Sequence, residues 1–474
     1  MTPDEFRAAG HRVVDWIADF RTELDTLPVM ARTAPGAVAK AFPATPPETP
    51  QPLDEIFATL DRTIVPGITH FGHPRFFGFF PTGSVEASML GDFLSTGLGA
   101  LGLTWQSAPA LTEVEEVTTD WVRQMVGLSP AWRGVIQDTA STATLVALVC
   151  ARERASNFAL TREGLQGPDA PLVVYASAQS HSSVLKAALV AGFGRAHVRE
   201  IETDAATYAM RPEALAAAMR EDRGRGWTPC AVVATSGSTT CTAFDPIADL
   251  VAIAAEHGAW VHVDAAMAGS AMVLEACRPL WDGIEGADSL VLNPHKWLGA
   301  IFDCSLYLVR DPEHLVRVMS TNPTYLQSQA AADVTTYRDW GIALGRRFRA
   351  LKLWTLIHLE GVEAIRARIR RDLDHAQWLA AAVAATPGWR VLAPVPLQTV
   401  CVRHEPPGLD GEALDAHTRA WCDRVNASGV AYLTAAVLDG RWMVRVAMGA
   451  PTTERHHLEE TWKAMRDAAA SAVR

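Results

Sequence analysis

One lysine has a type and a position in the sequence that suit covalent chemistry. Lys296 lies in the segment NPHKW (residues 293–297), directly after a run that is typical of a buried strand. A lysine at a strand end, beside apolar residues, is expected to lose hydration, which lowers the pKa of its amine and makes it nucleophilic. For a lysine taken alone, a place in a surface turn is the more common outcome.

One aspartate has a position that complements the lysine Lys296. Asp264 ends the apolar run Trp260–Asp264. A carboxylate at the end of a buried strand needs a cation or a hydrogen-bond donor to remain ionised. A protonated pyridine nitrogen would meet that need through a charge-assisted hydrogen bond, which contributes about 1.5–3 kcal/mol. A single aspartate in such a position also commonly caps a helix.

Two polar loops complete the set. The segment DTAST (138–142) lies between an expected strand and an expected helix, where backbone N–H groups, hydroxyls and the helix dipole favour an anion. The segment SGST (236–239) follows another expected strand. Each loop alone is more often an ordinary cap or turn. Together with Lys296 and Asp264 they suit a ligand with a phosphate, a ring nitrogen and a carbonyl, and pyridoxal 5'-phosphate has all three.

The pattern in the middle of the chain indicates which elements position these residues. There, β-rich runs alternate with alanine-rich helical runs. This alternation predicts an α/β fold with a mostly parallel sheet, in which ligands bind beyond the carboxyl ends of the strands. The motifs above lie at such ends. The expected strands are Gly134–Gln137, Leu172–Ala176, His197–Ile201, Ala231–Thr235, Trp260–Asp264, Ser289–Asn293 and Ser305–Val309.

The two ends of the chain indicate further parts. The segment TPDE (2–5) predicts a capped start of an amphipathic helix, and six prolines within residues 33–52 predict an extended arm. We expect helix and arm to dock on a partner subunit, with packing on their own domain as the alternative. The expected division is an N-terminal helical arm over 1–85, a large α/β domain over 86–345 and a small α+β domain over 346–474. In the small domain, the pair Asp439-Gly440 predicts a hairpin turn.

Composition narrows the classes of function. The 474 residues include 42 basic and 53 acidic ones, a formal net charge of −11, which argues against nucleic acid or an anionic membrane as a partner. The basic residues in 346–352 are expected to form structural ion pairs. Seven cysteines without a CxxC motif predict neither a disulfide framework nor a metal site. An acidic N-terminus without a long apolar run predicts a soluble, cytoplasmic protein.

The motifs resemble those of the group II pyridoxal-phosphate-dependent amino-acid decarboxylases, most closely the aromatic-L-amino-acid decarboxylases. NPHKW with an upstream HVDAA is the most specific pair. The resemblance implies the aspartate-aminotransferase type of fold (fold type I, here with a seven-stranded sheet) and a homodimer with active sites at the subunit interface. It rests on HPRFFGFFPTGS (73–84), TWQSAPALTEVE (104–115), VIQDTASTATLVAL (135–148), SAQSHSSVLKAAL (177–189), HVDAAMAGSA (262–271), NPHKWL (293–298), FDCS (302–305) and GRRFRALKLW (345–354).

The resemblance also implies roles for individual residues. Lys296 would bind the cofactor aldehyde as a Schiff base, Asp264 would pair with the ring nitrogen, and His181 would stack on the ring. Further cofactor contacts are implied for Thr139, Ala140, Ser141, Thr239, Ala266 and Asn293. Substrate contacts are implied for Thr82, which would meet the carboxylate, and for Phe71, Phe79, Phe80, Pro81, Leu101, Leu103 and Gly345.

The activity implied is the decarboxylation of an aromatic L-amino acid to an arylalkylamine and CO2, with a small-molecule substrate as the expected ligand. Two positions favour tryptophan-like substrates over phenolic ones. Phe79 stands where animal members of the family commonly carry a tyrosine, and Gly345 stands where members that act on phenolic substrates carry a serine. Tyr325 resembles the lid tyrosine that protonates the substrate carbon, whereas related aldehyde synthases carry phenylalanine. The alternatives are an aldehyde synthase, another fold-type-I enzyme such as an aminotransferase or cysteine desulfurase, or a non-catalytic binding protein.

Overall fold

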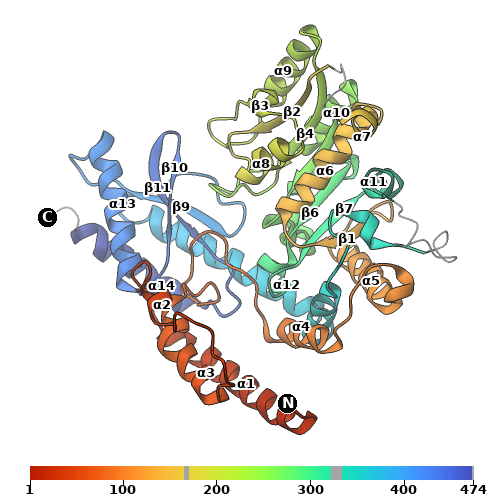
Figure 1. The fold of residues 1–474 in the computed structure, drawn as a ribbon. Coiled ribbons are helices and arrows are strands. Elements are labelled where there is room, and N and C mark those ends of the chain that lie inside the picture. Colours follow the sequence, from red (N-terminus) through yellow and green to blue (C-terminus); the bar gives the residue numbers. More distant parts are fainter. Residues whose placement is uncertain (165–169, 322–333, 472–474) are drawn as a thin grey trace. The chain divides into compact units, whose positions relative to one another are not determined.

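The computed structural model describes residues 1–164, 170–321 and 334–471 (Figure 1). These residues form two compact units. The larger unit comprises residues 82–380 and 391–401, and the smaller unit comprises residues 1–81, 381–390 and 402–474. The three-part division expected from the sequence stays a prediction.

A seven-stranded sheet forms the centre of the larger unit, in the order β1-β7-β6-β5-β4-β2-β3. Only β7 runs against its neighbours β1 and β6, while the other neighbouring pairs are parallel. Six strands therefore end at one edge, and the predicted mostly parallel sheet is confirmed. The strands are β1 (Arg133–Gln137), β2 (Leu172–Ser177), β3 (Val198–Ile201), β4 (Thr228–Thr235), β5 (Trp260–Asp264), β6 (Ser289–Leu292) and β7 (Ser305–Val309).

Five predicted strand boundaries are wrong by one to three residues, and two of these are the start of β1 at Arg133 and the end of β2 at Ser177. β6 ends at Leu292 because the N–H of Asn293 leaves the ladder and donates to Ala266 O at 2.9 Å. β3 begins one residue late because His197 closes a short 3-10 turn. β4 begins early, at Thr228, whose N–H donates to Pro171 O at 2.9 Å.

Helix α6 packs against this sheet and against α8, and the buried side chains of the two helices include the small residues Ala143, Ala147 and Ala187. Small residues let a helix approach the sheet closely, which explains the alanine-rich pattern. The helices are α4 (Glu86–Leu98), α5 (Pro109–Met125), α6 (Ala140–Ala155), α7 (Ala159–Glu163), α8 (Ser182–Val190), α9 (Pro212–Gly224), α10 (Ile247–His257), α11 (Pro312–Met319) and α12 (Arg349–Ala384).

The smaller unit confirms two local predictions. At the start of α1, the Glu5 N–H donates to Thr2 Oγ1 (3.2 Å) and the Thr2 N–H donates to Glu5 Oε2 (2.7 Å), which is the predicted capping box. Asp439 and Gly440 take positive φ values of 51° and 71° in the predicted hairpin turn. Its helices are α1 (Pro3–Glu23), α2 (Ala37–Lys40), α3 (Leu53–Thr59), α13 (Gly411–Ser428) and α14 (Arg455–Ser471). A second sheet has the order β10 (Thr434–Leu438), β11 (Arg441–Ala447), β9 (Thr399–His404) and β8 (Trp389–Val391), of which residues 391 and 399–401 are counted in the larger unit.

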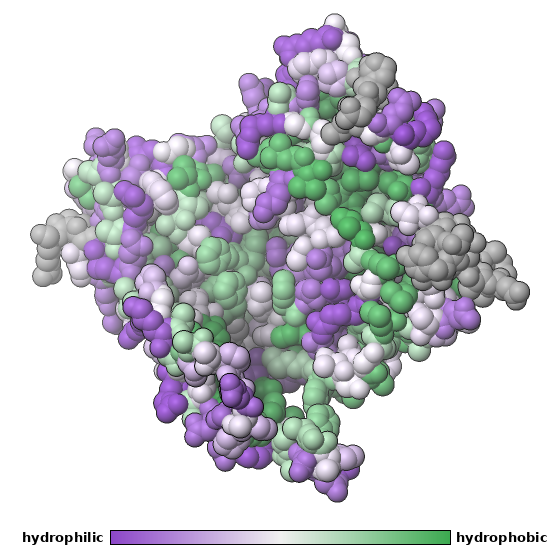
Figure 2. Space-filling model, in the orientation of Figure 1, coloured by the Kyte–Doolittle hydropathy of each residue, from purple (hydrophilic) through white to green (hydrophobic). Residues whose placement is uncertain are grey.

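The surface carries apolar side chains among polar ones (Figure 2). None of the residues of α1 is buried, and Phe6 is 58% exposed. On α4, Phe93, Leu94 and Leu98 are 52%, 56% and 65% exposed. Among the described residues, no helix is both long and apolar enough to cross a membrane.

The predicted structural role of the basic residues in 346–352 is confirmed. Arg346 pairs with the buried Glu115 at 2.6 Å, and Arg349 pairs with Asp303 at 3.0 Å. Arg347 and the fully buried Lys352 both pair with Asp92, at 3.3 and 2.9 Å. These pairs tie the start of α12 to α4, α5 and the segment before β7.

Candidate active site

Lys296 lies in a short helical turn that directly follows β6. Its side chain is partly buried, and its N–H donates to Asn293 O at 2.9 Å. The Asn293 N–H in turn donates to Ala266 O at 2.9 Å, so the turn is joined to the segment after β5. Because β5 and β6 are parallel neighbours, Lys296 and Asp264 follow adjacent strand ends.

A glycine brings Thr82 to the same turn. The Gly83 N–H donates to His295 O at 2.9 Å, and a Cβ built on Gly83 would lie 2.4 Å from Gly299 Cα. Only a residue without a side chain permits this approach. Its neighbour Thr82, which is partly buried, is therefore held next to the lysine turn.

Asp264 is 7% exposed, and its Oδ1 accepts the Ala266 N–H at 3.1 Å. The Asp264 carbonyl accepts the Ser236 N–H at 2.8 Å, which joins the ends of β4 and β5. Burial lowers the pKa of His181, while the negative charge of Asp264 opposes this shift and the positive charge of Lys296 adds to it. The fold thus brings the three groups Lys296, Asp264 and His181 within electrostatic reach of one another.

The ring of His181 is oriented by its own loop. Its Nδ1 accepts the Ser183 N–H at 3.2 Å and lies 2.8 Å from Ser183 Oγ, which caps the start of α8. The neighbouring Ser180 Oγ lies 3.0 Å from Thr235 Oγ1 at the end of β4. Ser183 orients His181, and Ser180 joins the same loop to the end of β4. Nothing in the sequence distinguishes these two serines from ordinary loop serines.

The start of α6 offers donors for an anion. Thr139, the N-cap residue, is extended (φ −136°) and its side chain makes no capping hydrogen bond. The first N–H groups of a helix have no partner within the helix, so those of Ala140 and Ser141 can serve an anion. The Oδ1 of Asn293 accepts the Ser305 hydroxyl at 2.6 Å, which leaves its side-chain N–H groups as donors.

The turn that carries Thr239 packs closely against the segment after β5. Gly237 has a φ of +81°, and a Cβ there would lie 2.3 Å from Ala268 Cβ. A glycine is therefore required for this turn to lie beside Ala266 and its neighbours. Thr239 itself is partly buried.

These donors and acceptors fit pyridoxal 5'-phosphate. The helix start suits its phosphate, and the buried carboxylate of Asp264, with one backbone donor on Oδ1, suits a protonated ring nitrogen. Lys296 supplies the amine. The cofactor residues predicted from the sequence follow strands that end at a single edge of the sheet.

The predicted substrate residues fall into two groups. In the larger unit, the Gly102 N–H donates to Arg346 O (2.9 Å) and the Arg346 N–H donates to Gly102 O (3.0 Å). This bridge brings Gly345 to Leu101 and Leu103, because a Cβ on Gly345 would lie 3.4 Å from Leu101 Cδ1 and 4.0 Å from Leu103 Cδ2. The smaller unit holds the other group, Phe71, Phe79, Phe80 and Pro81. Tyr325 lies outside the described residues.

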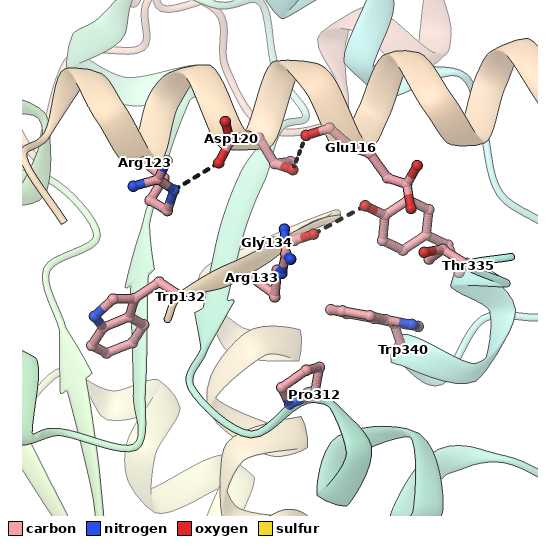
Figure 3. A pocket seen from close by; sticks show the side chains of 11 residues that line it. Glu116, Asp120, Arg123, Trp132, Arg133, Gly134, Pro312, Thr335 and Trp340 are labelled. Carbon is pink, nitrogen blue, oxygen red and sulfur yellow. Dashed lines mark hydrogen bonds and ion pairs between the residues drawn. The ribbon is translucent and has the colours of Figure 1, made fainter. Parts of the chain in front are cut away.

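Of two cavities in the larger unit, one is lined by a predicted site residue and the other is not. A cavity of about 240 Å³ is lined by Asp138 and Thr142 of the phosphate loop together with Gly345. A cavity of about 440 Å³ lies between α5, β1 and the segment around Trp340, where Arg123 donates to Asp120 at 2.7 Å (Figure 3). No predicted site residue lines this larger cavity.

A cluster of metal-ligand types in the smaller unit is accounted for by hydrogen bonds. Ligand atoms of Asp25, His456 and His457 lie within 4.8 Å of one another. The Nδ1 of His457 accepts the Glu454 N–H at 2.9 Å, so the neutral ring carries its proton on Nε2, 3.4 Å from Asp25. Arg75 also pairs with Asp25, at 2.9 Å. Both His457 and the Arg75 guanidinium thus contact the Asp25 carboxylate.

His262 is a buried residue behind the site that the sequence analysis did not single out. Its Nδ1 lies 2.9 Å from Ser289 Oγ and its Nε2 lies 3.3 Å from Thr144 Oγ1. It therefore joins β5 to β6 and to α6, the helix whose first N–H groups could serve an anion. Burial lowers its pKa to about 4, so the ring is neutral at pH 7.

The burial of the His262 ring should make the free energy of unfolding depend on pH. Between pH 6.5 and about 4 the unfolded chain binds a proton at His262 that the folded chain does not. The free energy of unfolding should therefore fall with falling pH, by about 1.4 kcal/mol per unit from this residue. We expect His262→Asn to flatten the dependence in urea unfolding at pH 4.5–7, and His11→Asn, at an exposed site on α1, to leave it unchanged. Equal slopes in His262→Asn and the unaltered protein would contradict the assignment.

Known proteins similar to this chain share most of its length. The family described as "Pyridoxal-dependent decarboxylase conserved domain" matches residues 35–405. A phenylacetaldehyde synthase of Arabidopsis thaliana is 38% identical, covering 99% of this chain and 96% of the relative. Tryptophan decarboxylase 2 of Oryza sativa subsp. japonica is 38% identical, covering 100% and 96%. The crystal structure of Oryza sativa TDC with PLP and tryptamine superposes with a TM-score of 0.96 at 36% identity, covering 99% of each chain.

Proposed function

The chain belongs to the pyridoxal-dependent decarboxylase family, and on this basis we propose that it converts an aromatic L-amino acid into CO2 and the corresponding arylalkylamine. It is a carboxy-lyase with pyridoxal 5'-phosphate as its cofactor. The observation that carries the proposal is the convergence of Lys296, Asp264 and His181 at one sheet edge, beside an uncapped helix start. The assignment of individual roles below is part of the proposal.

When bound, the cofactor supplies an aldehyde that takes up an amino group and a ring that accepts electrons from the bond to the departing carboxylate. The start of α6 and Asn293 hold its phosphate. Asp264 holds a proton on the ring nitrogen, and neutral His181 packs on the ring without adding a charge that would compete with Asp264. Lys296 accepts and returns the proton of the exchanging amine, and Thr82 orients the substrate carboxylate with its hydroxyl.

Two groups of apolar residues support an aromatic substrate. Gly345 beside Leu101 and Leu103 leaves the space of a side chain open, which suits a wide ring such as an indole. Phe71 and Phe79 have ring centroids 6.1 Å apart and planes 8° apart, a stacked arrangement that suits a flat partner. A relative named tryptophan decarboxylase and one solved with tryptamine agree with an indolic substrate.

A panel of amino acids tests the proposal. Purified enzyme with its cofactor should release CO2 and tryptamine from L-tryptophan, with less amine from L-tyrosine and L-dihydroxyphenylalanine. Formation of an oxo acid would instead indicate an aminotransferase. A preparation that takes up no cofactor and stays colourless would indicate a non-catalytic protein.

A relative named phenylacetaldehyde synthase favours a second candidate, decarboxylation coupled to oxidation by O2. Tyr325 favours the simple decarboxylase, because a tyrosine that donates a proton to the substrate carbon would do so before oxygen reacts. We expect Tyr325→Phe to shift the product from amine towards aldehyde, ammonia and hydrogen peroxide, measured per CO2 released. Equal peroxide from Tyr325→Phe and the unaltered enzyme would contradict this role of Tyr325.

We also propose a homodimer, with residues 1–85 as an arm that docks on the partner subunit. The exposed apolar residues of α1 and α4 support it, since such surface is commonly covered in an assembly. The larger domain would then span 86–345 and the small domain 346–474. All seven cysteines are free, which supports a reducing, cytoplasmic location.

A further inference from the structure

Strand β1 is an edge strand of the larger sheet, and it leads directly into the phosphate loop at residues 138–142. Among the described strands it pairs only with β7. In an antiparallel pair, alternate residues turn their backbone N–H and C=O groups away from the neighbouring strand, and such groups need other partners where they are buried. The partners of these outward groups therefore determine how the end of β1 is held.

One ion pair binds both backbone groups of Ile136, two residues before the phosphate loop. The Ile136 N–H donates to Glu115 Oε1 at 2.8 Å, and Arg346 Nη2 donates to the Ile136 carbonyl oxygen at 2.8 Å. The same Nη2 donates to Glu115 Oε1 at 2.6 Å. The two side chains, one from α5 and the other from the segment before α12, thus bind the edge of β1 as a neighbouring strand would.

Tyr337 holds the same edge of β1. Its hydroxyl donates to Gly134 O at 3.2 Å (Figure 3). The guanidinium carbon of Arg346 lies 4.9 Å from the centre of the Tyr337 ring, and both residues are buried. The ring therefore helps to fix the guanidinium that binds Ile136.

The backbone of Arg346 is fixed independently of its side chain. Its N–H and its carbonyl oxygen both bond to the backbone of Gly102, at 3.0 and 2.9 Å. These bonds remain available when the side chain is replaced, because they involve only main-chain atoms. A substitution at position 346 should therefore act on Ile136 and Glu115, and not on the bridge that brings Gly345 to its neighbours.

The pair of Glu115 and Arg346 is only partly hydrogen-bonded. The side chain of Glu115 is fully buried, and that of Arg346 is 7% exposed. Within the described residues, Glu115 Oε2 and Arg346 Nη1 are buried without a hydrogen-bond partner. The burial of two charges costs free energy that their attraction offsets only where the remaining polar atoms are also bonded. Stability alone is therefore a weak explanation for this pair, whereas its bonds to Ile136 are complete.

We propose that Glu115 and Arg346 are positioning residues for the cofactor phosphate. They hold Ile136, and through it the start of α6, which begins at Ala140 only four residues further along the chain. Arg346 also lines the cavity of about 240 Å³ that Asp138 and Thr142 of the phosphate loop line, so the pair and the loop lie close together. This inference rests on the proposed function, in which the start of α6 holds the phosphate.

Two forms of the cofactor separate the binding of the phosphate from the binding of the ring. Pyridoxal lacks the phosphate of pyridoxal 5'-phosphate but keeps its aldehyde and its ring. The cofactor is removed from the holoenzyme, and the dissociation constant of each form is measured by absorbance. Arg346→Met removes the donor to Ile136 O, and it should raise the dissociation constant of pyridoxal 5'-phosphate about tenfold, as expected for the loss of one hydrogen bond to a charged group. The dissociation constant of pyridoxal should not change.

Two control variants test whether the effect is specific. Glu115→Gln keeps an oxygen for the Ile136 N–H and for the guanidinium, and it should bind both forms as the unaltered protein does. Arg154→Met removes an ion pair to Asp288 (2.7 Å) from the last turn of α6, at the end opposite to the phosphate loop, and it should also change neither constant. An equal rise for both forms in Arg346→Met, or a rise for neither, would overturn the inference. So would a tenfold rise for pyridoxal 5'-phosphate in either control.

Arg346→Met leaves the Glu115 carboxylate buried without its cation, which can prevent folding. In that case the double variant Glu115→Gln/Arg346→Met, which removes both charges, carries the same expectation and the same overturning outcomes. The inference and the proposed function fail in different ways. An unaltered protein that binds pyridoxal 5'-phosphate no more tightly than pyridoxal would overturn the proposed phosphate site and the inference with it. A preference for the phosphate form that persists in Arg346→Met and in the double variant would overturn the inference alone.

Discussion

Replacement of Lys296 by alanine is expected to lower kcat for amine release by on the order of 10³ or more, because a positioned proton-transfer group alone contributes about 10²–10⁴ and the nucleophilic amine is lost as well. The residue lies in the turn after β6, beside the end of β5. Reduction with borohydride followed by peptide mapping should link the cofactor to Lys296 in the unaltered enzyme. No other lysine should carry the label.

The control for this experiment is Lys186→Ala, which removes an exposed lysine from α8 in the same unit. It should leave kcat and the trapped peptide unchanged. Label at another lysine, or full activity of Lys296→Ala, would contradict the assignment of the amine and with it the mechanism built on this strand end.

Replacement of Asp264 by asparagine should have the second largest effect. The amide keeps the size of the side chain and an oxygen for the Ala266 N–H, now bound at 3.1 Å, but it loses the charge. A hydrogen bond to a charged partner contributes about 1.5–3 kcal/mol, so kcat should fall about 10- to 100-fold. The dissociation constant of the cofactor, measured by absorbance, should rise in the same variant.

Asp249→Asn, at an exposed position in the first turn of α10, is the matched control and should change neither quantity. If Asp264→Asn retained full kcat and full cofactor affinity, the carboxylate would not interact with a charged ring nitrogen.

Several parts of this protein could be predicted from the sequence because they depend on neighbours in the chain. The alternation of β-rich and alanine-rich runs predicted the strands, since continuous apolar runs are typical of strands buried on both faces. The capping box of Thr2 and Glu5 and the turn at Asp439 and Gly440 are likewise local, and both are confirmed. The motifs around Lys296 and Asp264 identified the chemistry because they follow such strands.

Other features were decided only by the tertiary structure, because they join residues far apart in the sequence. Asn293 leaves its strand to bind Ala266, and the buried His262 lies between Thr144 and Ser289. The hydroxyl of Thr434 holds the backbone of Phe79 from a strand near the other end of the chain. A threonine in a strand has no local pattern that announces such a partner, since the partner is set by which segments the fold places side by side. The sequence by itself therefore determined the chemical groups and their strand ends, and the packing of distant segments determined how those groups are held.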